Sequence, residues 1–336
     1  MNSRQKKTIS LWLYSGIFLV IAMVLIGGIT RLTHSGLSMV EWKLIGGIIP
    51  PLNETAWQET FSKYQQFPEY QKINKDMILS EFKTIFFWEY IHRLLGRLIG
   101  LVFVIPFFLF WKKQWLDKKL KKQLIFLLLL GGFQGFLGWF MVKSGLVDVP
   151  VVSHFRLAIH LVTAFALIGY IYWIIMEVEE KEKFPSRKIN NFVKGFVILF
   201  LIQIIYGAFI AGLKAGYLLP PNSNYFEKVF SYTIRDSNDF SLLNNGFDIQ
   251  AFHRLFAWII AIIAFLIFKK TQYTNLKKEG RLLFTLVIFQ IILGISTLLL
   301  SVQIHVAIIH QFFAILVLLS AFRLLYLSTE NSQSEI

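Results

Sequence analysis

Apolar runs of about twenty residues recur along the whole chain, and this feature constrains the fold more than any other. A run of that length crosses the hydrocarbon core of a bilayer as an α-helix. Only 16% of the 336 residues are charged, whereas about a quarter are charged in soluble domains. The predicted spans are 9–29, 85–110, 123–142, 154–176, 195–213, 251–268, 282–301 and 306–326. We therefore predict an all-α polytopic membrane protein with eight transmembrane helices.

The basic residues behind the net charge of +14 lie mainly at the N-terminus and in the loops between these spans. Lys and Arg gather at the N-terminus and in 112–122, 181–194 and 269–281, whereas the long loop 30–84 balances basic with acidic residues. The positive-inside rule then places both termini in the cytoplasm and loop 30–84 outside. Topology and lipid contact account for the charge, so we expect no nucleic-acid partner. The short basic N-terminus runs directly into a full-length span, as a retained first helix does.

The second half of the chain repeats motifs of the first. A His-Arg pair, a Gln-x-x-x-Gly motif and an Ile-His pair each recur four spans apart. They lie at 92–93 and 253–254, at 134–138 and 290–294, and at 159–160 and 309–310, with a further Gln-x-x-x-Gly at 203–207. Matched motifs four spans apart give both halves the same orientation. We predict two pseudo-symmetric four-helix bundles, residues 1–184 and 185–336.

Four histidines lie in the outer part of the even-numbered spans: His92, His160, His253 and His310. Each is followed four residues later by Gly or Ala on the same helix face, which leaves a flat slot beside the imidazole. Intramembrane histidines are rare and usually face the bundle interior, and haem iron accepts neutral imidazoles. We expect one bis-histidine haem site in each half. The small residues could instead serve close helix packing, and a single histidine could form an interhelical hydrogen bond.

Five arginines lie on or near the outer side, against the trend of the loop charges: Arg31, Arg93, Arg97, Arg156 and Arg254. Haem propionates are carboxylates, and the guanidinium group suits them. These residues are candidate propionate contacts. Snorkelling of the side chains to the membrane interface is the alternative.

Glu89 distinguishes the two halves. It stands three residues before His92 on the same helix face, and Gln250 has the matching position before His253. A carboxylate in a dry pocket could exchange protons, which predicts redox or oxygen chemistry in the N-terminal half and electron supply from the C-terminal half. The alternative is an ion pair between Glu89 and Arg93, one turn further along the helix.

Together these motifs resemble the haem A synthase family over essentially the whole chain. The resemblance rests on GGITRLTHSGLSMVEW (27–42), the proline pair 50–51, EFKTIFFWEYIHRLLGR (81–97) and the paired histidines of the later spans. The long outer loop, with FSKYQQFPEYQKIN (61–74), resembles the branch shared with mitochondrial and many Gram-negative members. Some members carry a cysteine pair in this loop. This chain has no cysteine, so a mechanism that needs that disulfide cannot operate here.

The resemblance implies oxidation of the C8 methyl of haem O to the formyl group of haem A, for cytochrome oxidase. It implies a haem B cofactor on His253 and His310, the substrate haem O on His92 and His160, and Glu89 as the functional glutamate. In the mechanism we expect, electrons pass through haem B to the substrate iron, the methyl is hydroxylated successively, the gem-diol loses water and Glu89 handles protons.

We expect the protein in the bacterial plasma membrane, and the topology predicted from the loop charges puts the haem sites toward its outer side. Haem O synthase, cytochrome oxidase assembly factors, membrane lipid and an unidentified electron donor are the expected partners, and a homo-oligomer is left open. Two other functions compete with this prediction. A bis-histidine dihaem cytochrome b would transfer electrons only, and a haem carrier would bind without chemistry.

Loop 30–84 is expected to form a cap. Trp57, Phe61 and Tyr64 recur at helical spacing and predict an amphipathic helix. That helix could cover the N-terminal site or lie in the membrane interface. The three remaining histidines are expected to be structural or interfacial: His34, His154 and His305.

Overall fold

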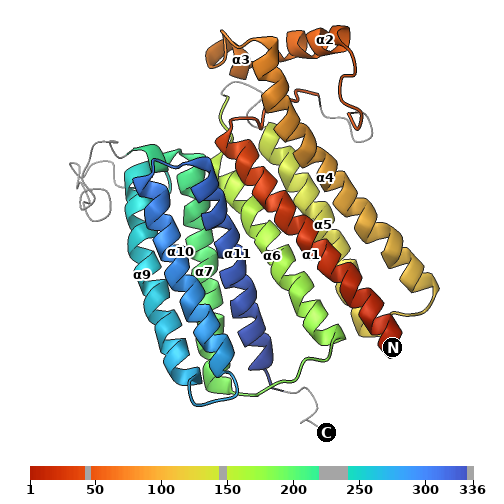
Figure 1. The fold of residues 1–336 in the computed structure, drawn as a ribbon, viewed down its shortest axis with the longest axis vertical. Coiled ribbons are helices and arrows are strands. Elements are labelled where there is room, and N and C mark those ends of the chain that lie inside the picture. Colours follow the sequence, from red (N-terminus) through yellow and green to blue (C-terminus); the bar gives the residue numbers. More distant parts are fainter. Residues whose placement is uncertain (42–46, 144–149, 219–240, 331–336) are drawn as a thin grey trace.

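The computed structural model describes residues 1–41, 47–143, 150–218 and 241–330, and its regular structure within these ranges is helical. Eight of the helices described are long and apolar enough to cross a membrane. They are α1 (Ser3–Leu32), α4 (Leu79–Lys112), α5 (Lys118–Lys143), α6 (His154–Val178), α7 (Arg187–Gly212), α9 (Gly246–Thr271), α10 (Lys277–Leu299) and α11 (Ile304–Leu327). The prediction of an all-α protein with eight spans is confirmed (Figure 1).

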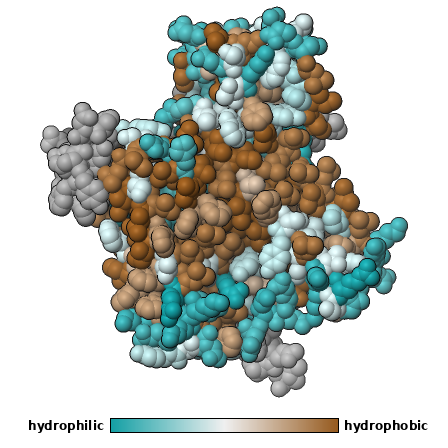
Figure 2. All heavy atoms as spheres, in the orientation of Figure 1, coloured by the Kyte–Doolittle hydropathy of each residue, from teal (hydrophilic) through white to brown (hydrophobic). Residues whose placement is uncertain are grey.

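A hydrophobic band crosses the middle of the face shown in Figure 2, with hydrophilic residues at both ends. Most of the helices extend a few residues beyond the predicted spans, because their polar ends are helical as well. Asn2, Ser186 and Asn245 cap α1, α7 and α9 by accepting hydrogen bonds from backbone N–H groups of the first turn. Apolar composition therefore marks the lipid-embedded part of a helix, whereas the cap marks its end.

The helices of each half lie together (Figure 1). In the first half α1 packs on α4 and α6, and α5 packs on α6; in the second half α7, α9, α10 and α11 pack in turn, and α7 contacts α11. The halves meet where α6 touches α7 and α11, and where α1 touches α11. Ile168 and Ile174 of α6 and Val317 of α11 are completely buried in the shared hydrophobic core. The division of the chain into two four-helix bundles stays a prediction, because α6 packs on α7 across the halves as closely as α1 packs on α4 within the first.

The outer loop forms two short helices, α2 (Glu54–Tyr64) and α3 (Pro68–Lys72). Helix α4 has 34 residues, and at 1.5 Å per residue it is about 51 Å long, well beyond the roughly 30 Å of hydrocarbon. Its N-terminal end projects past the neighbouring helices and carries α2 and α3 (Figure 1). Trp57, Phe61 and Tyr64 pack around Phe82 and Phe86 of this projection. The predicted amphipathic helix is confirmed, and its apolar face packs on α4.

Candidate functional site

Each of the four paired histidines lies against a glycine of a neighbouring helix. A Cβ atom added to that glycine would come within 3.0 to 3.3 Å of the imidazole Cε1 atom. The pairs are Gly27 with His92, Gly138 with His160, Gly207 with His253, and Gly294 with His310. Contacts this short exclude any larger residue without movement of the ring. The glycine of each Gln-x-x-x-Gly motif is therefore required to make room for a histidine ring. Gly27 has the same role, but the motif did not identify it, because no glutamine stands four residues before it.

The glutamines of these motifs contact the same histidines. Gln134 donates from Nε2 to the backbone oxygen of His160 at 3.0 Å, and Gln203 does so to that of His253 at 2.9 Å. The Nε2 atom of Gln290 lies 3.4 Å from the Nε2 atom of His310. The amide groups therefore join the helices of His160, His253 and His310 to their neighbours at the depth of the imidazole.

The histidines fit the ligand set predicted for haem. All four Nδ1 atoms are buried without a hydrogen-bond partner in the described parts of the chain. The imidazoles of His92 and His160 are close enough to interact electrostatically, as are those of His253 and His310. Within the same ranges no three His, Asp or Glu side chains gather to hold a metal ion by themselves. Two imidazoles per site match a metal whose remaining ligands come from a macrocycle.

The small residue that follows each histidine leaves space beside the imidazole, and this space is filled differently in the two halves. A small cavity in the C-terminal half is lined by Gln203, Gln290 and Ala257, which stands four residues after His253. In the N-terminal half, the position four residues after His92 is Gly96. The methyl group of Met23 lies 3.3 Å from the place of a Cβ atom on that glycine.

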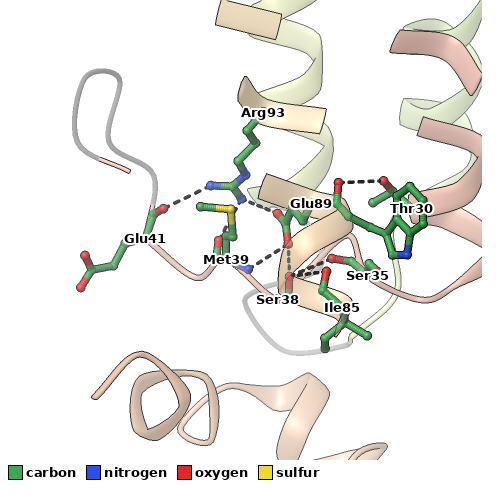
Figure 3. A network of polar contacts seen from close by, with 9 residues as sticks. Thr30, Ser35, Ser38, Met39, Glu41, Ile85, Glu89 and Arg93 are labelled. Atoms are coloured by element: carbon green, nitrogen blue, oxygen red, sulfur yellow. Dashed lines mark hydrogen bonds and ion pairs between the residues drawn. The ribbon is translucent and has the colours of Figure 1, made fainter. Parts of the chain in front are cut away.

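Glu89 is buried and its carboxylate is held by the outer loop (Figure 3). One oxygen accepts from Ser38 Oγ at 2.7 Å and from Met39 N at 2.8 Å, and the other lies 2.5 Å from Arg93 Nη2. The ion pair with Arg93, which the sequence left open, is the arrangement found. Proton transfer by Glu89 stays a prediction, because no contact here tests it.

Gln250, the counterpart of Glu89 in the second half, also joins its helix to a segment outside the membrane spans. It is buried and donates from Nε2 to the backbone oxygen of Ala215 at 3.0 Å, in the short 3-10 helix η1 (Ala215–Tyr217) that follows α7. Both residues therefore fasten the outer segment of their half to the helix that bears the histidine. The difference is that Glu89 does so with a charge.

The candidate propionate arginines have protein partners. Arg31 donates from Nη2 to the backbone oxygens of Ala211 and Gly212, at 2.8 and 2.9 Å, and so caps the C-terminal end of α7. Arg93 donates to the backbone oxygens of Met39 and Glu41, and Arg156 donates to that of Phe140. Arg97 and Arg254 are partly buried. Contact with propionates stays a prediction for all five.

The remaining histidines lie at helix ends. His34 follows α1 with a φ angle of 54°, and burial together with the nearby charges of Lys214 and Arg31 lowers its pKa. His154 opens α6 and its Nε2 atom is 2.8 Å from the backbone oxygen of Leu243. His305 is exposed at the start of α11. These positions fit the structural role expected for the three residues.

Comparison with known proteins gives one consistent result. Residues 10–322 match the model of a family described as Cytochrome oxidase assembly protein. Proteins named Heme A synthase from Flavobacterium johnsoniae and Flavobacterium psychrophilum are each 44% identical to this chain, over 94% of it and 96% of their own length. The protein of that name from Nitrosospira multiformis is 41% identical over 94% of this chain and 92% of its own.

Proposed function

Because the chain belongs to the Cytochrome oxidase assembly protein family, we propose that it is a haem A synthase, an oxidoreductase that converts the C8 methyl of haem O to the formyl of haem A. Two features support this function: the similarity to relatives of that name over nearly their whole length, and the two pairs of glycine-backed histidines. The histidine pairs are the decisive observation, because they supply ligands for two haems within one chain.

The two pairs take different haems in this proposal. His92 and His160 hold the substrate haem O in the N-terminal half, residues 1–184, and His253 and His310 hold haem B in the C-terminal half, residues 185–336. Haem B, when bound, would supply one-electron redox chemistry for the oxidation. The glycines set the imidazole positions, and the amide groups of Gln203 and Gln134 hold the histidine helices in place.

Conversion of a methyl group to a formyl group involves proton transfer, so the site needs a group that can take up and release protons. Glu89 is proposed for this role. Its Oε2 atom accepts the hydroxyl hydrogen of Ser38, which links the carboxylate to the outer loop rather than to the membrane interior. Arg93 orients the carboxylate through their ion pair.

In the cell we place the protein in the bacterial plasma membrane, with both termini in the cytoplasm and the haem sites toward the outer side. The basic residues of the loops support this orientation. Haem O must be supplied by another enzyme, and the product serves cytochrome oxidase, so haem O synthase and oxidase assembly factors are the proposed partners. An unidentified electron donor is the remaining proposed partner.

Haem extraction tests the function directly. The protein is expressed in a host that makes haem O but not haem A, and the haems are separated by chromatography. Haem A is expected with the wild-type chain and should be absent after His92→Ala or His253→Ala. If haem O stays unconverted in a host able to supply electrons, the synthase function is refuted. Tightly bound haem B in that protein would then favour electron transfer, and unmodified haem that exchanges would favour a carrier.

A further inference from the structure

One position differs between the two halves in the helix that faces each histidine. In three helix pairs a glutamine stands four residues before the glycine beneath the imidazole: Gln134, Gln203 and Gln290. In the fourth pair, α1 with α4, that position is Met23, four residues before Gly27. All four glycines face the Cε1 atom of their histidine at similar distance, so the four positions are equivalent in space as well as in sequence.

The glutamines tether the histidine helices. Gln134 and Gln203 donate to the backbone oxygen of the histidine residue itself, and the Nε2 atom of Gln290 lies beside the ring of His310. In an apolar span such an amide has few other partners, so it holds the two helices together where the ligand is bound. Methionine has no hydrogen to donate. The α1–α4 pair therefore lacks this tether at His92.

Met23 also lies on the helix face that the macrocycle would use. Its methyl carbon is 3.3 Å from the place of a Cβ atom on Gly96, four residues after His92. In the other half the equivalent face, at Ala257, borders a cavity that Gln203 and Gln290 line. A methionine side chain has three rotatable bonds and a polarisable sulfur, so it can fill that face and also move aside.

We propose that Met23 makes the His92–His160 site the exchangeable haem site of the protein. It removes the tether from one ligand helix and covers the ligand face with a side chain that changes rotamer readily. The glutamine-tethered site in the C-terminal half keeps its haem. The inference rests on the proposed function, which needs one haem to remain while the other enters as substrate and leaves as product.

Haem transfer to excess apomyoglobin tests this. Full-length protein in detergent is loaded with haem O and haem B, and chromatography identifies the haem that leaves. We expect haem O to leave faster than haem B. Met23→Gln should slow the fast phase about three- to tenfold, the range expected for one hydrogen bond within a membrane protein. Met23→Leu, which also lacks a donor, should stay within about twofold of the wild type.

The reciprocal change is Gln203→Met, which should speed the loss of haem B. The absorption spectrum of the reduced protein checks that every variant keeps bis-histidine ligation, so a misfolded variant is recognised. Equal effects of Met23→Gln and Met23→Leu, or no effect of Met23→Gln and Gln203→Met, would overturn the inference.

Failure of the proposed function would look different. A protein that forms no haem A, yet shows a fast phase that Met23→Gln slows, would refute the synthase function and keep the exchange role of Met23. Formation of haem A together with a fast phase indifferent to Met23→Gln would overturn the exchange role alone.

Discussion

Each histidine ring of the candidate sites has its place because the residue facing it is glycine. The Cβ atom of an alanine at position 294 would lie 3.0 Å from His310 Cε1, so the ring would have to shift. Gly294→Ala should therefore lower the amount of haem B that copurifies with the protein. Haem content per protein, measured by the pyridine haemochrome spectrum, is the readout.

The matched control is Gly131→Ala in α5, where an added Cβ meets nothing within 4 Å. Replacing glycine by alanine inside a helix stabilises it by up to about 1 kcal/mol. This variant should bind as much haem as the wild type and melt at the same or a higher temperature. Equal haem content in both variants would show that Gly294 is not needed to position His310 as a haem ligand.

Glu89 combines a structural contact with a proposed chemical one, and Glu89→Gln separates them. The amide keeps the size of the side chain but leaves Arg93 without its anionic partner, at a cost of about 1.5–3 kcal/mol for a charged hydrogen bond. Haem B content should stay unchanged, haem A formation should fall, and backbone amides of residues 35–41 should exchange hydrogen faster.

Ser38→Ala is the companion variant, because it removes one donor and leaves the carboxylate. It should loosen the same segment with a smaller loss of haem A. Wild-type haem A formation in Glu89→Gln would exclude the glutamate from the reaction and leave it as an anchor of the outer loop.

At the scale of elements, α2 and α3 are held together by a polar contact that we expect to depend on pH. Tyr64 donates its hydroxyl to Glu69 at 3.1 Å, and Asn74 donates to Tyr64 at 2.8 Å. Burial raises the pKa of Glu69 from 4.5 to about 7, and the nearby charge of Glu89 adds to this. The raised pKa means that the folded cap binds a proton that the unfolded segment releases.

The stabilising effect of this proton is complete below about pH 4.5 and is lost as the pH rises through about 7. It amounts at most to something on the order of 3 kcal/mol. Hydrogen exchange of residues 54–72, corrected for the intrinsic rate, should show more frequent opening at pH 8 than at pH 5. Glu69→Gln should abolish the difference, and a pH dependence that survives in this variant would contradict the assignment.

Helices of this chain could be predicted from the sequence where one physical term dominates. The length of an apolar run fixes a membrane span, and the spacing of Trp57, Phe61 and Tyr64 fixes an amphipathic helix. Tertiary choices could not be predicted in this way. The contacts of Gly27 with His92 and of Met23 with Gly96 depend on how α1 packs against α4, and the sequence of α1 does not predict that packing.

The same limit applies to Glu89. Arg93 and His92 both lie on its side of the helix, and sequence spacing alone gave no reason to prefer either. The backbone N–H of Met39 and the hydroxyl of Ser38, from a loop about fifty residues away in the chain, turn the carboxylate toward the outer segment.

For the whole molecule, the orientation in the membrane is a separate prediction. The sequence has no cysteine, so single introduced cysteines report location without background. Gln66 in loop 30–84 and Lys118 at the start of α5 are both exposed. A membrane-impermeant maleimide should label Gln66→Cys in intact cells, and Lys118→Cys only after the membrane is opened. The reverse pattern would invert the topology and place the histidines near the cytoplasm.

The central claim is that the two halves, joined through α1, α6, α7 and α11, each bind one haem between two histidines. The most direct measurement is the haem content and absorption spectrum of four alanine variants, one for each histidine, purified from a host that makes only haem B. His253→Ala and His310→Ala should lose the low-spin bis-histidine spectrum of haem B, whereas His92→Ala and His160→Ala should keep it. Retention of that spectrum in His253→Ala and His310→Ala would contradict the account.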